Sequence, residues 1–398
     1  MKCLARSLVM VAGVLMVASW ATAQEPDLAK PYGGSVTVGG QYTDNRDGLK
    51  NDKHSNVDLY IEPRGDLYWR DGERTTLDIF LAPLAKWHSN PRTASDGDPQ
   101  HRADAYGSGG IDLVHEFTPL LNLTFNDTLS YDDDPSVDLG GTGVRYNSSL
   151  LLNDAHGDIA AELTPQVGLE LIGHDAIKRY NDSTVAANEN EQTVETEADL
   201  GYTLGSGYKV FGLGGFSSFD NESTTHSRGA DVYSVGLGVE KRLNANVHAR
   251  VTGGYQEAHY SDTAFDDKGM ANGKADLVFR PESATRFRVT TMYGFYTPYV
   301  QPYSVQKLFA VQGAIDHDLL PERLTATLRG QYSDSEYDAE GAGAPGGSDK
   351  LTSAGVDVTY RLNRNWGVTV GYTFENWNSE VREDFSRNTV DASVKASF

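Results

Sequence analysis

The stretch "NVDLYIEPRGDLYWRDGERTTLDIFLAPLAKW", residues Asn56–Trp87, decides the fold class of this chain. From Val57 to Trp69 every second residue is apolar or small, and the residues between them, from Asp58 to Arg70, are polar or aromatic. Successive side chains of a β-strand point to opposite faces, so this alternation predicts a long strand with one apolar face. The following Asp71-Gly72 dipeptide is a strong hairpin signal, and the alternation then resumes.

The same period of two recurs along most of the chain. It is clear in "LNLTFNDTLSY", "RFRVTTMYGFY" and "WGVTVGYTF". The segments run over about 10–14 residues, well beyond the ~5–6 residues typical of soluble strands. Strands of that length match a tilted crossing of a lipid bilayer, which takes about 9–11 residues.

The connections between these segments alternate in kind. Eight are tight, such as Gly205-Ser206-Gly207, and nine are longer, polar and mostly acidic, such as "DAEGAGAPGGSD". This alternation is typical of outer-membrane barrels, which have short periplasmic turns and longer extracellular loops. With an opening strand near Ser35–Tyr42, we predict an all-β, transmembrane, antiparallel up-and-down barrel of about 18 strands.

One segment leaves the number of strands open. Within residues 144–163, "NDAHGDIAAEL" interrupts the clean alternation, and a bulge or an extra hairpin there would change the count. The alternative fold is a secreted soluble sandwich or β-helix. Eighteen long strands would require two thick layers in a sandwich, and no repeat of fixed period indicates a solenoid.

The N-terminus predicts export across an inner membrane. Lys2 and Arg6 precede the apolar run "SLVMVAGVLMVASW", and Ala21-Thr22-Ala23 offers a small-residue cleavage site. We therefore expect residues 1–23 to be a signal peptide, 24–33 a short periplasmic segment and 34–398 the barrel. A retained anchor is the alternative, but the apolar run is short and no positive stop-transfer patch follows it.

Composition narrows the class of protein. The one cysteine, Cys3, lies in the predicted signal peptide, so the mature chain has no disulfide, as is ordinary for a bacterial envelope protein. The formal net charge of the chain is −22, which argues against nucleic acid as a partner.

The last residues, "NTVDASVKASF", also alternate. They resemble the terminal assembly signal of bacterial outer-membrane proteins, in which a final aromatic residue follows alternating apolar residues. The residues that match this signal are Val390, Ala392, Val394, Ala396 and Phe398. The resemblance implies recognition by the barrel-assembly machinery, insertion in the outer membrane of a Gram-negative bacterium, and contact with its lipids and lipopolysaccharide.

No catalytic or metal site is predicted. Neither G-x-S-x-G nor H-E-x-x-H occurs, so we expect no enzyme activity and no cofactor. The acidic segments Asp132–Asp138 and Asp262–Gly269 offer oxygen ligands for Ca²⁺, but they lack the D-x-D-x-D-G spacing. Solvated outer loops are the favoured interpretation of both segments.

The polar faces of the predicted strands indicate a water-filled lumen. The lumen-lining candidates are Asp58, Tyr60, Glu62, Arg64, Asp66, Asp78, Lys86, Arg242, Arg250, Arg286, Arg288 and Arg329. Both signs of charge are present, and a mixed, tyrosine-rich wall suits neutral or weakly anionic polar solutes such as sugars. The alternative is that these charges pair across strands and brace the wall.

The whole mature chain resembles the β-barrel porin type 2 family. The resemblance depends on size, on eighteen predicted strands, on the short segment "QEPDLAKPYGG" before the barrel, and on strands such as "RFRVTTMYGFYTPY" and "DVTYRLNRNWGVTVGYTFENW". It implies a channel for export of an exopolysaccharide or capsule-type polymer, working with a periplasmic polysaccharide-export protein. The alternatives are a general or solute-specific diffusion porin, and a structural or adhesive barrel without transport.

Overall fold

The computed structural model describes thirteen ranges of the chain: 31–51, 53–72, 74–93, 100–132, 148–205, 207–221, 229–244, 246–261, 266–282, 284–296, 306–337, 346–381 and 383–398. The predicted signal peptide and most of segment 24–33 lie outside these ranges. So do residues 133–138 of the first acidic segment considered for Ca²⁺ and residues 262–265 of the second.

The described chain forms eighteen strands and one short helix. The strands are β1 (Tyr32–Thr43), β2 (Asn56–Asp71), β3 (Thr75–His88), β4 (Ala103–Thr118), β5 (Leu121–Asp132), β6 (Leu150–Glu162), β7 (Val167–Tyr180), β8 (Glu191–Thr203), β9 (Tyr208–Asn221), β10 (Ala230–Asn244), β11 (Val247–Tyr260), β12 (Lys268–Glu282), β13 (Thr285–Tyr296), β14 (Gln306–Leu320), β15 (Leu324–Tyr337), β16 (Gly347–Arg361), β17 (Trp366–Ser379) and β18 (Phe385–Ser397). The helix α2 (Ser183–Glu189) lies between β7 and β8.

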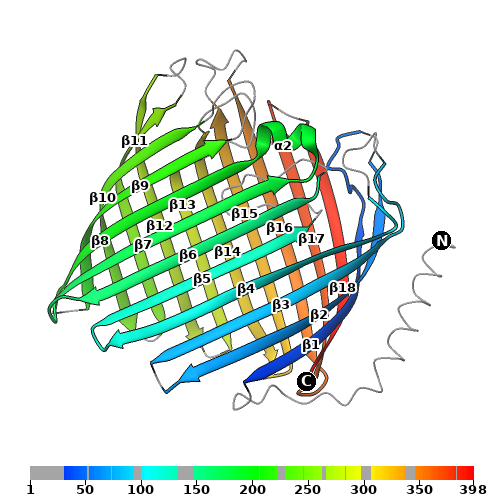
Figure 1. Ribbon diagram of the computed structural model, residues 1–398, viewed down its shortest axis with the longest axis horizontal. Helices are drawn as coiled ribbons and strands as arrows, with labels where there is room; N and C mark the ends of the chain where they lie inside the picture. The colour runs from blue at the N-terminus through cyan, green and yellow to red at the C-terminus, as the bar shows by residue number, and fades with distance from the viewer. Residues whose placement is uncertain are drawn as a thin grey trace.

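All eighteen strands belong to one closed antiparallel sheet. Each strand pairs with its neighbours in the chain, and β1 also pairs with β18. The closing register runs from Ser35 opposite Ser397 to Thr43 opposite Thr389. Figure 1 shows the resulting barrel, with strands strongly inclined to its axis. The predicted fold class and strand number are confirmed.

The two ends of the barrel differ as the sequence predicts. The connections from even-numbered to odd-numbered strands, such as β2–β3 and β16–β17, span only two to four residues. The other connections span five to seventeen residues, and α2 lies in one of them. In Figure 1 the short turns and the C-terminus lie at one end and α2 at the other. The turn at Gly72 has a φ of 59°, a conformation that glycine adopts without steric cost.

Three details of the strands differ from the prediction or resolve it. In the uncertain region 144–163, the described residues 148–163 contain one uninterrupted strand, β6, and no additional hairpin. The first strand begins at Tyr32, three residues before the predicted Ser35, because its pairing with β2 already starts at Tyr32 opposite Leu67. The helix α2 follows the Asp182 side chain, which accepts a hydrogen bond from the backbone N–H of Val185 at 3.1 Å and caps it.

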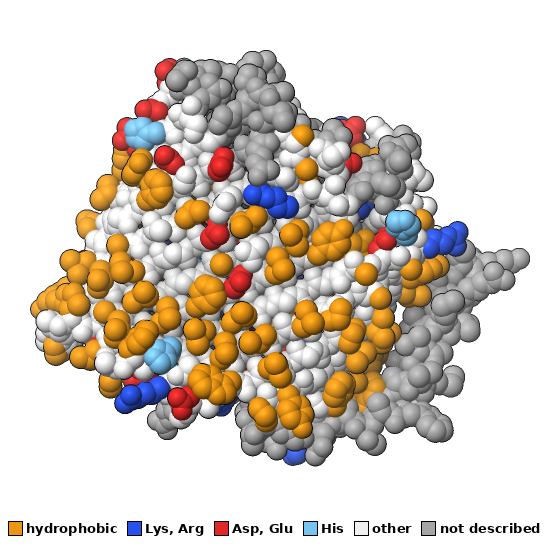
Figure 2. Space-filling model, in the orientation of Figure 1, with side chains coloured by type: hydrophobic (Ala, Val, Ile, Leu, Met, Phe, Trp, Pro, Cys, Tyr) orange, Lys and Arg blue, Asp and Glu red, His pale blue; other side chains and the backbone are white. Residues whose placement is uncertain are grey.

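The apolar faces of the strands form a belt on the outside of the barrel. On β2 and β3, the side chains of Ile61, Leu67, Trp69, Ile79 and Leu81 are 37–66% exposed. Figure 2 shows such side chains spread over the wall, with most of the charged side chains on that face near its upper and lower margins. Leaving one leucine-sized side chain in water costs about 1.5–3 kcal/mol, so a belt of this extent requires lipid around it.

Within the described residues, no helix is long and apolar enough to cross a membrane.

The last residue completes the seam between β1 and β18. The backbone N–H of Phe398 donates to the carbonyl of Gly34 at 2.9 Å, and Gly34 N–H donates to the carbonyl of Phe398 at 3.1 Å. The Phe398 ring lies so close to Gly34 that a Cβ on Gly34 would approach it to 2.7 Å. Asp44 and Asn388 tie the other end of the seam, with hydrogen bonds of 2.6–3.1 Å.

We expect deletion of Phe398 to lower the yield of assembled barrel by several-fold, because it removes the last backbone pair of the seam and the predicted assembly signal. The measurement is the amount of heat-modifiable, membrane-embedded protein on gels. The conservative variant Phe398→Tyr should assemble normally. An unchanged yield after the deletion would contradict this role of Phe398.

Candidate functional site in the barrel interior

The inner face of the wall is the side opposite the exposed apolar belt. On β2 the even-numbered residues lie on this face, since Leu59, Ile61 and Leu67 occupy the outer one. By the same alternation, the predicted residues Asp58, Tyr60, Glu62, Arg64 and Asp66 follow one another along the inner face of β2.

The other predicted residues share this face but not one site. Asp78 and Lys86 lie on β3, Arg250 on β11, Arg286 and Arg288 on β13, and Arg329 on β15. The structure therefore distributes the twelve candidates around the barrel. Arg242 lies on β10, but its side chain is outside the described part.

Most of the predicted charges are paired with a neighbour of opposite sign. Arg64 Nε lies 2.7 Å from Asp66 Oδ1, and its guanidinium sits 4.0 Å above the Phe80 ring. Arg288 pairs with Asp316 at 2.9 Å and Arg329 with Asp357 at 2.5 Å. The Arg288 and Arg329 pairs join neighbouring strands, as in the bracing alternative from the sequence, whereas Arg64 and Asp66 lie on the same strand.

Tyr60 and Asp78 have different surroundings. The Tyr60 ring lies across Gly39 on β1, where a Cβ would come within 2.5 Å of it, so Gly39 makes room for the ring. The carboxyl oxygen Oδ1 of Asp78 is buried without a hydrogen-bond partner in the part of the chain that the structure describes. The same holds for Nε of Arg286.

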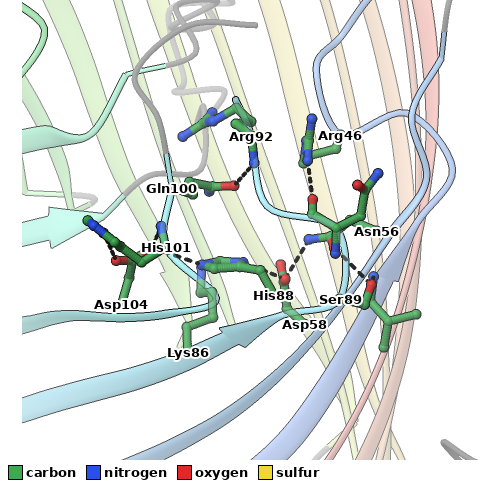
Figure 3. Close-up of polar contacts among 12 residues, drawn as sticks. Arg46, Asn56, Asp58, Lys86, His88, Ser89, Arg92, Gln100, His101 and Asp104 are labelled. Atoms are coloured by element: carbon green, nitrogen blue, oxygen red, sulfur yellow. Dashed lines mark hydrogen bonds and ion pairs between the residues drawn. The ribbon is translucent and has the colours of Figure 1, made fainter. Parts of the chain in front are cut away.

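A buried polar cluster ties the loops to the wall where β2, β3 and β4 meet the longer connections (Figure 3). At its centre, the side chain of His88 is 1% exposed, and its Nδ1 lies 2.7 Å from Asp58 Oδ1. Its Nε2 lies 3.7 Å from Asp104 Oδ2 on β4. Lys86, also buried, reaches Asp132 at 3.3 Å and lies 5.2 Å from the centre of the Tyr106 ring.

Two loops meet above this cluster. Asn56 Oδ1 accepts hydrogen bonds from Ser89 Oγ and from the backbone N–H of Asn90, both at 3.0 Å. Arg46, from the β1–β2 connection, donates to the carbonyl of Asn90 and pairs with Asp47 at 2.7 Å. Figure 3 shows Arg46 above Asn56 and Arg92 beside Gln100, whose side-chain Oε1 accepts a hydrogen bond from the Arg92 backbone N–H at 3.0 Å. The base of the β3–β4 connection is therefore fixed to the inner wall.

The wall made by β6, β7 and β8 carries a concentration of carboxylates that the sequence interpretation did not select. The inner-face carboxylates of these three strands are Asp154, Asp158, Glu162, Glu170, Glu191, Glu195, Glu197 and Asp199. On β8 the signal was present as "EQTVETEADL", in which Glu191, Glu195, Glu197 and Asp199 share one parity opposite Val194 and Leu200.

Basic groups meet these carboxylates at three levels. At one end of the wall Lys178 pairs with Glu191 at 2.9 Å. Midway, His174 lies 3.1 Å from Asp154 and 3.2 Å from Glu195.

Lower on the wall, Arg250 pairs with the fully buried Asp199 and lies 3.6 Å from Glu170 and 3.7 Å from Glu197. Its guanidinium also stacks 4.6 Å from the centre of the Phe211 ring. Of the residues in these contacts, only Arg250 is among the lumen-lining candidates predicted from the sequence.

The described part of the inner wall lacks the geometry of a metal site. Among the described residues, no group of three or more histidine, cysteine or acidic side chains has a geometry that could hold a metal ion.

Comparison with known proteins gives one family. The family model described as "Putative beta-barrel porin 2" matches residues 32–398. A comparison with curated proteins finds no match.

Solved structures that align with most of this chain have little sequence identity to it. The outer membrane protein opdK from Pseudomonas aeruginosa is 11% identical, with a TM-score of 0.49, covering 92% of this chain and 99% of its own. OccAB3 of Acinetobacter baumannii is 13% identical, with a TM-score of 0.45 and coverages of 92% and 99%. The FrpB iron transporter from Neisseria meningitidis is 10% identical, with a TM-score of 0.49 and coverages of 93% and 82%.

We expect His88→Ala to loosen the β3–β4 connection, because it leaves the buried carboxylate of Asp58 with the hydrogen bond from Asn56 Nδ2 but without the one to His88. Loss of such a bond costs roughly 1–3 kcal/mol, so tryptic cleavage after Arg92 or Arg102 should speed up at least about fivefold. The control is His101→Ala, since the His101 side chain is 86% exposed. Equal cleavage rates in both variants and in the wild type would rule out this anchoring role.

Proposed function

This chain belongs to the Putative beta-barrel porin 2 family, and from that premise we propose that it is a passive diffusion channel for polar solutes. It is an outer-membrane, porin-type barrel. The observation that carries the proposal is the contrast between its faces: a closed wall whose outer side is an apolar belt and whose inner side is charged. Such a wall separates lipid from a polar interior.

The charged inner face supports transport over a purely structural role. The side chains of Asp154, Glu195 and Arg329 point into the barrel, yet they are 47%, 43% and 53% exposed. A charged side chain that is about half exposed and points inward borders open space, and that space must hold water, since exposing a charge to a dry interior is very costly. We therefore propose water along the inner wall between the anchored loops and the short turns.

Export of a polysaccharide is the second candidate, and it was the first expectation from the family resemblance. Aromatic rings on the inner face support it, because sugars stack on such rings. Phe80, Tyr106 and Phe211 each lie beside a cationic side chain on that face. A polymer channel would also need a periplasmic export protein as a partner.

Conductance in planar bilayers distinguishes these functions. We expect the purified, heat-modifiable protein to give stable open channels and to admit small neutral sugars into liposomes. Block of the open channel by an added polysaccharide, together with loss of surface polymer on gene deletion, would favour export instead. Assembled protein without any conductance would contradict the channel proposal and favour a structural or adhesive barrel.

A further inference from the structure

We propose that the β6–β8 wall makes the channel selective for small cationic solutes, an inference that depends on the proposed channel function. The inner-face carboxylates of β6, β7 and β8 named above, here called the acidic ladder, would form the path that these cations follow. The mixed wall expected from the sequence suited neutral or weakly anionic solutes, so this inference changes the expected solute class.

The acidic ladder extends along the strands rather than forming one compact cluster. On β8, Glu195, Glu197 and Asp199 occupy successive inner-face positions, which lie about 6.6 Å apart along a strand. On β6, Asp154 and Asp158 are separated by one inner-face position, that of His156. The carboxylates thus follow one another along the wall.

Several of these carboxylates are open to the interior. The side chains of Asp154, Glu195 and Glu197 are 47%, 43% and 38% exposed. Asp199, by contrast, is fully buried against Arg250. The ladder therefore has a braced lower part and an accessible middle part.

The neighbouring basic groups offset only part of the negative charge. Eight inner-face carboxylates on β6–β8 meet three permanently charged partners in the described residues: Lys178, Lys209 and Arg250. That leaves an excess of five carboxylates (8 − 3), or four if His174 is protonated. A wall with this excess raises the local concentration of cations and lowers that of anions.

The opposite wall of the barrel does not cancel the negative charge of the acidic ladder. In the closed eighteen-stranded sheet β15 lies nine strands from β6, on the opposite side of the barrel. Its Arg329 is paired with Asp357, and Arg288 on the nearby β13 is paired with Asp316. Arg286, also on β13, has a buried Nε without a partner among the described residues, but one such group does not form a row that anions could follow.

The spacing also favours passage over retention. Conduction needs sites that attract an ion but release it to the next site. The carboxylates of the acidic ladder meet that requirement, because they lie one after another along the wall and no group of them among the described residues could hold a metal ion. The ladder should therefore conduct cations without binding them tightly.

The test is the reversal potential of single channels in a gradient of KCl at low ionic strength, repeated with L-lysine hydrochloride as an organic cation. One carboxylate about 6 Å from a monovalent cation in water enriches it about threefold, so we expect a wild-type preference for potassium over chloride of at least about threefold. A preference for chloride, or none, in a conducting wild-type channel would overturn the acidic ladder alone. Absence of conductance would instead overturn the proposed function.

A matched pair of variants assigns the selectivity to this wall. Asp158→Asn, Glu195→Gln and Glu197→Gln together should lower the preference for potassium about threefold to tenfold. The control combines Asp220→Asn, Glu257→Gln and Glu336→Gln, which remove the same charges from exposed positions on the outer face. Equal selectivity in the two triple variants would refute the proposal, and so would entry of lysine no faster than that of glutamate.

Discussion

The rest of this structure depends on one constraint: in hydrocarbon, every backbone N–H and C=O must find its partner inside the protein. A sheet satisfies this condition only when it has no free edge, which is why β1 pairs with both β2 and β18. The constraint extends to the last residue, since Phe398 and Gly34 exchange two backbone hydrogen bonds. Once the sheet closes, period-two alternation directs apolar residues to lipid and polar residues inward, so a solute inside the barrel meets the polar face.

Charge on that inner face serves two purposes at different positions. Where residues are buried, as at His88 between Asp58 and Asp104, charges and hydrogen bonds hold the loops against the wall. Where carboxylates stay exposed, as at Glu195 and Glu197, they set the field that a passing solute meets. Arg250 serves both purposes, because it braces Asp199 and limits the negative charge beside the path.

The sequence predicted architecture far better than it predicted the site. The Asn56–Trp87 hairpin was readable because its polar and apolar residues separate cleanly by parity, and the turn at Gly72 is a local signal. β6 was hard to read because polar residues occur on both faces there. On the outer face, where the alternation predicts apolar residues, Asn153 donates a hydrogen bond to Asp127 of β5 at 2.6 Å, so the two polar side chains satisfy each other's hydrogen bonding. The acidic ladder was missed because its members come from three strands, and their proximity depends on a register that the sequence does not reveal. The His88 cluster depends in the same way on how two loops fold back.

The central claim is that alternate residues of the wall face water inside the barrel and lipid outside it. Because the only cysteine of the chain is Cys3, single cysteines can be placed along β8 and probed with a charged, membrane-impermeant thiol reagent in reconstituted channels. We predict rapid labelling at positions 193, 195 and 197 and slow labelling at 194, 196 and 198. Labelling without alternation, or with the opposite parity, would contradict a water-filled interior lined by this face.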